Sequence, residues 1–378
     1  MNPDNSLETL ALPVLALAAG LAMFGLFVGL NGHDPVQAWR LLFVGAFGDA
    51  FSLQNTLQRA APLMLTALCV TLPARAGLTV IGGEGALVLG GLACAALPAA
   101  LPLPANSLGT ALMLAAAALA GGAWIALAGW LRQWRGVNET ISSLLLSYIA
   151  IALFKHTVEG PLRDPASLNK PSTLPLPEAL RIGTLGSWDV HWGLVWGGVL
   201  CVLAGVWLLA TTHGFATRVV GGNPRAAQIV GLPATRLIVT ACALGGACAG
   251  LAGGIEVAAV HTSANASLIV GLGYTGILVS FVARHQPLAI IPVAVLFGGF
   301  LAAGSLLQRR MGLPDASVQV LMGFCFVTIL ASEALRGKLG GLLTLRRPRT
   351  PSAGATGGSV ATGATGTPGT TAAAGAAA

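Results

Sequence analysis

A single acidic side chain stands inside an apolar, glycine-rich stretch of this sequence. Glu84 is flanked by Gly82, Gly83 and Gly85, about five residues into a segment that is otherwise apolar. Glycine weakens a plain spanning helix, and an unpaired carboxylate inside such a helix costs several kcal/mol, so this pattern favours a functional break over simple packing.

A second glycine-interrupted stretch, residues 271–276, contains Tyr274 and Thr275. Broken spans at corresponding places in two halves of a chain are typical of solute paths, because half-helix ends present partial charges and open backbone groups to a passing solute. The residues that we predict to line such a path are Gly82, Gly83, Glu84, Gly85, Tyr274 and Thr275. Glycine also lets membrane helices approach closely, as the spacing of Gly246 and Gly250 suggests, so packing alone is the alternative interpretation of either break.

The sequence offers no motif for bond chemistry. A Walker A pattern is absent, because the Gly337-Lys338 pair has Ser332 where the first glycine would stand and Leu339 after the lysine. Neither G-x-S-x-G nor H-E-x-x-H occurs, and the six cysteines lie in apolar runs without C-x-x-C spacing. We therefore expect no enzymatic activity, no cofactor and no metal site.

The composition is that of a membrane protein. Of 378 residues, 55% are hydrophobic and only 9% are charged, against about 25% charged residues in a soluble domain. The mean hydropathy of +0.79 indicates many spans and not one anchor. The net charge of +7 would suggest nucleic acid in a soluble protein, but here the basic residues lie in short loops between apolar stretches, so we expect membrane lipid and no nucleic acid as a partner.

Cutting the chain at its charges and prolines leaves ten segments that are apolar enough to cross a bilayer. They cover approximately residues 12–30, 57–74, 78–97, 108–131, 140–154, 192–210, 237–255, 268–283, 287–305 and 318–335. We predict an all-α integral membrane protein with about ten transmembrane helices, in two related halves with broken helices. The transmembrane domain covers residues 1–345, and the Gly/Ala/Thr-rich residues 346–378 form a disordered cytoplasmic tail.

The basic residues predict that both ends of the chain are cytoplasmic. An even number of spans places both termini on one side, and the short loops at 130–136 and 217–236 are basic without an acid. Residues 1–9 carry Asp4 and Glu8 but no Lys or Arg, so the first segment is a span and not a cleavable signal. Trp192 is expected in an interfacial belt.

Two loops stand out between the spans. Residues 157–190 contain five prolines, which favour extended or turn backbone, and this segment is a candidate external docking surface. In the other loop, Asn223 can cap a short helix, Pro224 suits its first position and Gly231 can close it in the left-handed conformation. The helical positions between them include Arg225, Ala226 and Ala227.

A helix of barely two turns is not stable alone in water, so this one must pack against something. One alternative is the membrane surface or a neighbouring loop. The other is a groove on a cytoplasmic motor subunit, which would supply the ATP site that this chain lacks.

Several stretches, taken jointly, resemble one family. They are residues 75–85, 136–150, 160–165 and 221–231, together with 274–276 and 284–287, and the similarity covers about residues 54–335. In these stretches the chain resembles the permease subunits of bacterial ABC importers, in the branch for branched-chain amino acids, simple sugars and nucleosides. The likeness is greatest to nucleoside-type permeases that work with basic membrane lipoproteins.

The resemblance implies a subunit of the bacterial plasma (inner) membrane that moves a nucleoside-like or other small polar solute inward by alternating access. Its implied partners are cytoplasmic ABC ATPase subunits, a second and distinct permease subunit, and an external substrate-binding lipoprotein. The resemblance also implies that the helix from Asn223 to Gly231 transmits ATPase closure, and that the region around Glu84 lines the path.

The chain departs from the family pattern at four positions. Where the family usually has Phe-Asn-Ile-Gly with a Gln after Glu-Gly, this chain has Thr79, Val80 and Ala86, and Ser147 replaces a usual Asn. These changes remove amides that would bind a polar solute. The alternative function is an ion-coupled secondary transporter in which Glu84 is a proton or sodium relay.

Overall fold

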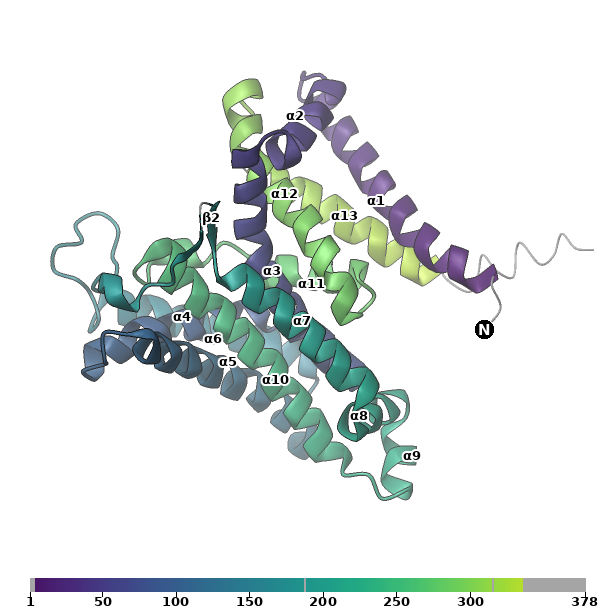
Figure 1. Cartoon of the computed structure of the whole chain (residues 1–378). Helices are drawn as coiled ribbons and strands as arrows, with labels where there is room; N and C mark the ends of the chain where they lie inside the picture. Colours follow the sequence, from purple (N-terminus) through teal and green to yellow (C-terminus); the bar gives the residue numbers. More distant parts are fainter. Residues whose placement is uncertain (1–3, 187, 315, 336–378) are drawn as a thin grey trace, which may run out of the picture. The chain divides into compact units, whose positions relative to one another are not determined.

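The computed structural model describes residues 4–186, 188–314 and 316–335 (Figure 1). The chain divides into two units, residues 1–334 and 335–378, and the description below concerns the first. The predicted tail at 346–378 lies outside the described residues.

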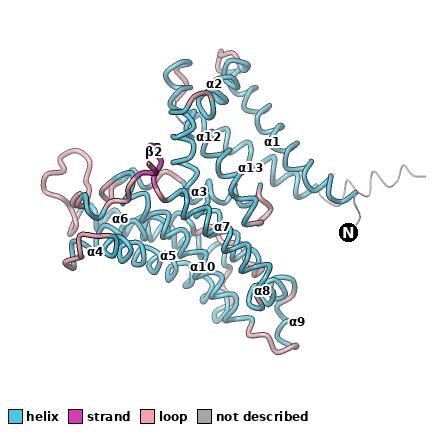
Figure 2. The backbone as a smooth tube through the Cα atoms, viewed as in Figure 1, coloured by secondary structure: helices cyan, strands magenta, loops and turns pink. Residues whose placement is uncertain are grey.

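The described chain is built almost entirely from helices, as the sequence predicts. The long and medium helices are α1 (Asp4–Leu30), α2 (Pro35–Phe47), α3 (Ala50–Arg75), α4 (Gly83–Ala100), α5 (Ser107–Arg135), α6 (Glu139–Glu159), α7 (Gly193–Ala210), α8 (Thr212–Gly222), α9 (Pro224–Ile229), α10 (Ala234–Ile255), α11 (Leu272–Val282), α12 (Pro287–Met311) and α13 (Ala316–Leu335). A π-helical turn, η2 (Glu256–His261), continues α10, and two 3-10 turns are η1 (Glu178–Leu180) and η3 (Ala266–Leu268). The strands β1 (Thr184–Leu185) and β2 (Trp188–His191) form one small antiparallel hairpin, seen in part in Figure 2.

Eight of the described helices are long and apolar enough to cross a membrane. They correspond to α1, α3, α4, α5, α6, α7, α10 with η2, and α12. The remaining two predicted spans fall on shorter apolar helices, residues 266–282 and 316–332, so the all-helical membrane fold is confirmed while the count of ten stays a prediction.

Two helices and the start of one span differ from what apolar length predicts. Helices α2 and α8 lie outside the predicted spans, because 13 and 11 residues are too few to cross a bilayer. The third predicted span also begins too early, since the chain is not helical between Gly77 and Gly82 and α4 starts only at Gly83.

Helix α10 packs along α5, α4 and α3 (Figure 1). Close approach to α5 depends on small residues: a Cβ on Gly250 would lie 2.2 Å from the Ala117 carbonyl oxygen, and one on Gly246 would lie 2.3 Å from that of Gly121. The packing role expected for the Gly246 and Gly250 pair is therefore confirmed. Helices α5 and α10 are therefore in direct backbone contact along this stretch.

The proline-rich segment is extended and turned, as predicted, and it covers one end of the helices. Its backbone N–H groups at Thr173, Leu176 and Ile182 donate to the carbonyl oxygens of Ala264, Thr262 and Ala258 at 3.0, 2.7 and 3.1 Å. These bonds tie the segment to η2 and the turn after it. Its role as an external docking surface stays a prediction.

Candidate functional site

The first break lies between α3 and α4. Gly77 has a left-handed φ of +84°, and a Cβ there would lie 3.0 Å from the Gly221 carbonyl oxygen, so both the conformation and the space require glycine. The next residues leave the helix, and α6 supplies partners for their backbone. The Ser143 hydroxyl accepts from the Ile81 N–H at 3.0 Å, and the Thr140 hydroxyl donates to the Thr79 carbonyl at 2.8 Å. Hydroxyls from a neighbouring helix thus provide hydrogen-bond partners for two backbone groups that the break leaves without helical partners.

The second break precedes α11. After η2 the chain turns through residues 262–271, and Gly271, with φ +82°, is the residue directly before α11. The N-cap residue of α11, Gly271, has no side chain that could accept a hydrogen bond from the first N–H groups of the helix. Its first N–H groups therefore need an acceptor from elsewhere in the molecule.

The acceptor is Glu84. Its Oε1 accepts from the Gly271 N–H at 2.9 Å and its Oε2 accepts from the Gly273 N–H at 2.6 Å, while the side chain is completely buried. The two breaks, separated by nearly 190 positions in the sequence, therefore meet at one carboxylate. The expectation that this carboxylate is unpaired was wrong, because a single sequence does not show which backbone donors the fold brings to it.

The carboxyl group of Glu84 lies between two helix N-termini. Glu84 occupies the first turn of α4 and binds the first turn of α11, and both turns carry the partial positive charge of unsatisfied N–H groups. The described residues give Glu84 no ion pair, so its hydrogen-bond partners are these backbone N–H groups. We call Glu84, Gly271 and Gly273 the carboxylate clamp.

The predicted path residues gather around this clamp, but they differ in exposure. Gly82, Gly83 and Gly85 are buried with Glu84. Tyr274 keeps 37% of its surface exposed, and Thr275 is partly exposed with its hydroxyl bonded to the Gly271 carbonyl at 3.1 Å. The clamp thus fixes the position of Tyr274, the most accessible member of the set.

A hydrogen-bond network joins the ends of α3 and α11, and the sequence analysis missed it. Arg75 Nε donates to the His285 carbonyl at 2.7 Å, His285 Nδ1 lies 2.8 Å from Ser280 Oγ, and that hydroxyl lies 2.7 Å from Thr71 Oγ1. His285 has a φ of 52°, unusual for a residue other than glycine. Burial, with a contribution from Arg75, lowers the pKa of His285 to about 4, so its ring is neutral near pH 7. The only sequence signal was that Arg75 and His285 fall within the stretches that carry the resemblance.

Helix α9 has the caps that the sequence predicts. The Asn223 side chain accepts from the Arg225 and Ala226 N–H groups at 3.1 Å, Pro224 takes the first helical position, and Gly231 has a φ of +83°. Ala227 alone is buried on this helix, where α9 packs on α8 and α10. Helices α8 and α10 therefore cover the face of α9 that carries Ala227.

The opposite side of α9 ends in two apolar side chains that the described residues leave uncovered. Ile229 is 86% exposed and Val230 is 72% exposed. Ile229 and Val230 thus form a small exposed apolar surface at the end of this short, capped helix.

Helix α8 connects α9 to the first break. A Cβ on Gly221 would lie 2.3 Å from the Arg75 carbonyl oxygen, whereas one on the next residue, Gly222, would meet nothing within 4 Å. The end of α8 is therefore packed directly on the end of α3 and on Gly77. Contacts thus run from α9 through α8 to Gly77, and residues 77–84 connect this junction along the chain to Glu84.

Comparisons with known proteins agree with this arrangement. The family model described as branched-chain amino acid transport system / permease component matches residues 52–330. The glucose ABC transporter permease protein TsgB13 of Haloferax volcanii is 32% identical over 355 residues, covering 91% of this chain and 93% of the relative. The guanosine ABC transporter permease protein NupP of Bacillus subtilis is 27% identical, covering 89% and 97%, and the nucleoside ABC transporter permease protein NupB of Lactococcus lactis is 25% identical, covering 84% and 90%.

The family model and these relatives cover the same body of helices that carries both breaks and α9. The chain belongs to the family of branched-chain amino acid transport system permease components, and it is a membrane-spanning permease subunit of an ABC importer.

Proposed function

We propose that this permease moves a nucleoside-like or other small polar solute inward by alternating access. The names of three relatives support this substrate class, since they are permeases for glucose, guanosine and nucleosides. The observation that carries the mechanism is the carboxylate clamp, because it ties the broken starts of α4 and α11 into one unit. Such a unit can be displaced as a whole, which alternating access requires.

The path in this proposal runs beside the clamp and not through the carboxylate. In this proposal Tyr274 and Thr275 face the path. The buried residues behind them, which hold them in place, are Gly82, Gly83, Glu84 and Gly85. Both oxygens of Glu84 already accept hydrogen bonds from backbone N–H groups. The complete burial of the Glu84 side chain argues against its being a proton or sodium relay, because a relay carboxylate must be reached by the ion or by water at each step.

The energy source in this proposal is a pair of cytoplasmic ABC ATPase subunits, because the sequence has no Walker A motif of its own. Asn223, Pro224, Arg225, Ala226, Ala227 and Gly231 form the coupling segment, and the exposed Ile229 and Val230 enter the ATPase surface. The junction of Gly221 with Arg75 and Gly77 passes its movement to the clamp.

The proposed setting is a bacterial inner membrane with both ends of the chain cytoplasmic. Basic residues support this orientation, since Arg225 lies in α9 and Arg236 near the start of α10, and residues 217–236 contain no acid. The complete transporter contains a second permease, which we propose to be a distinct paralogue, and an external substrate-binding lipoprotein. Reporter fusions at the ends of α9 and of the proline-rich segment test the orientation, because the proposal places them on opposite sides.

Uptake by the reconstituted complex tests the substrate class. We expect ATP-dependent accumulation of a labelled nucleoside or simple sugar in a panel that also contains branched-chain amino acids. Accumulation driven by an ion gradient in vesicles containing this chain alone would contradict the proposal.

A further inference from the structure

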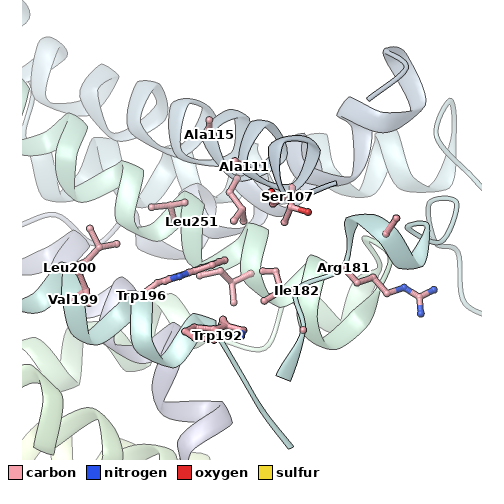
Figure 3. A pocket seen from close by; sticks show the side chains of 15 residues that line it. Ser107, Ala111, Ala115, Arg181, Ile182, Trp192, Trp196, Val199, Leu200 and Leu251 are labelled. Atoms are coloured by element: carbon pink, nitrogen blue, oxygen red, sulfur yellow. The ribbon is translucent and has the colours of Figure 1, made fainter. Parts of the chain in front are cut away.

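An apolar groove of about 730 Å³ lies away from the carboxylate clamp, between α5, α7 and α10 (Figure 3). None of its lining residues belongs to either break, to α9 or to the network around Arg75. The groove exists because α5 packs on α10 while α7 packs on α3 and α12. Helices α5 and α7 thus flank a space that protein side chains do not fill.

The groove runs along the helices and is not a rounded cavity. On α5 its wall extends from Ser107 to Ala115, and on α7 from Trp192 to Leu200, which is about 12 Å along each helix. Both stretches lie at the very start of their helices, and the floor is formed by the last turn of α10. The groove therefore begins at one end of the spans and extends into them, over most of the roughly 15 Å depth of one leaflet's hydrocarbon.

The lining excludes a polar solute. Its deeper part is made of apolar side chains such as Leu114, Val199 and Leu251. The Thr110 hydroxyl already donates to the Leu180 carbonyl at 3.2 Å, so it is not available as a donor for a ligand. Sites for polar small molecules present several converging polar groups, which this groove lacks.

The residues at the mouth of the groove suit the headgroup of a phospholipid. Trp192 lies there, and tryptophan is enriched where a bilayer meets water. Figure 3 shows Arg181 at the same end, with its guanidinium directed away from the apolar lining. Arg181 is exposed, its Nε donates to the Leu176 carbonyl at 3.0 Å, and the described residues give it no carboxylate within ion-pair distance.

We propose that this groove binds one acyl chain of an anionic phospholipid, with the phosphate-bearing headgroup at Arg181. The apolar length, the position at the end of the spans and the cation at the mouth together match this ligand. Helices α5 and α7 pack on different partners and leave the groove between them. An acyl chain in the groove would contact both helices and fill this space.

Photolabelling of the purified, reconstituted transporter tests the proposal. The probes are phosphatidylglycerol and phosphatidylcholine carrying a diazirine on one acyl chain, and the labelled positions are mapped by mass spectrometry. We expect labels at Val199 and Leu251, with phosphatidylglycerol at least fivefold above phosphatidylcholine. Absence of these labels, or their loss when the partner subunits are present, would overturn the site, because the second outcome means that a partner helix fills the groove.

Matched variants separate the groove from general lipid contact. Ala111→Phe with Ala115→Phe fills the groove from exposed positions and should lower labelling at Val199 and Leu251 at least fivefold. Ala123→Phe, on an exposed site farther along α5, should leave it unchanged. Arg181→Gln should reduce phosphatidylglycerol labelling to the phosphatidylcholine level. Unchanged labelling in the Phe double variant would refute the groove, and an unaltered lipid preference in Arg181→Gln would refute the headgroup contact.

Discussion

Glu84 and Gly273 touch through both side chain and backbone. The carboxylate accepts from the Gly273 N–H at 2.6 Å, and a Cβ on Gly273 would lie 2.2 Å from the Glu84 backbone nitrogen. The contact between Glu84 and Gly273 thus requires both the hydrogen bond and a residue without a side chain at position 273. The starts of α4 and α11 can meet only while both hold.

Removing the carboxylate should disable the permease. Glu84→Ala leaves the buried Gly273 N–H and the partly buried Gly271 N–H without an acceptor, at a cost of about 1–3 kcal/mol each when fully buried, and we expect a lower melting temperature and loss of uptake. Glu84→Gln should be intermediate, because its single amide oxygen can serve only part of the clamp. Thermal unfolding in detergent and uptake in vesicles measure these effects, with the exposed Glu178→Ala as control. Wild-type uptake by Glu84→Ala would show that the clamp is dispensable.

Adding one methyl group at Gly273 should have a similar effect without changing any charge. In Gly273→Ala the new Cβ meets the Glu84 backbone, so α11 must shift and the hydrogen bond to Glu84 must lengthen. We expect at least a tenfold loss of uptake. Gly198→Ala is the matched control, since a Cβ there meets nothing within 4 Å and alanine favours a helix interior. Equal uptake by the two variants would contradict the close contact.

The tip of α9 should be needed for coupling but not for folding. Ile229→Asp with Val230→Asp changes only exposed positions, so the melting temperature should stay within about 2 °C of the wild type. We expect the ATPase subunits to lose affinity and uptake to fall at least tenfold, and we expect Arg225→Glu and Gly231→Val to uncouple ATP hydrolysis from uptake. Leu168→Asp, at an 83% exposed position of the proline-rich segment, is the control. Normal ATP-driven import in the double variant would exclude this docking surface.

A substitution at the contact between Gly221 and Arg75 should reduce transport without preventing the ATPase from docking. Gly221→Ala places a methyl group against the Arg75 carbonyl, whereas Gly222→Ala adds one in open space. We expect the first variant to bind the ATPase and to hydrolyse ATP, but to import several-fold less solute, while the second behaves as the wild type. Co-purification, ATPase rate and uptake measured on the same preparation distinguish these cases. If both variants import normally, movement does not pass through this contact.

His285 should make stability depend on pH. Its folded-state pKa of about 4 is below the unfolded value near 6.5, so its contribution is fully present above pH 6.5 and is lost as the pH falls toward 4. His285→Asn should weaken this dependence, because asparagine tolerates the left-handed backbone and does not titrate. Melting temperatures of both proteins between pH 4 and 7 give the comparison. Parallel curves would assign the acid sensitivity to other groups.

The sequence by itself determined the class of fold and the local signals. Apolar length located the spans, because a bilayer demands about 20 apolar residues whatever their partners. Asn223, Pro224 and Gly231 specified α9, since a cap and a left-handed closure act over a few neighbouring residues. Glu84 and the glycines around it marked the first break for the same reason, as they conflict with a plain helix in their own segment.

Only the tertiary structure decided what these signals do together. Glu84 meets Gly273, Gly221 meets Arg75, and Arg75 meets His285 across separations of 189, 146 and 210 positions. No periodicity or capping rule extends over such distances, because these contacts depend on how whole helices pack and not on the residues next to them. The apolar groove has the same origin: it is a space between α5 and α7 that exists because these two helices pack on different partners, and no single segment encodes it.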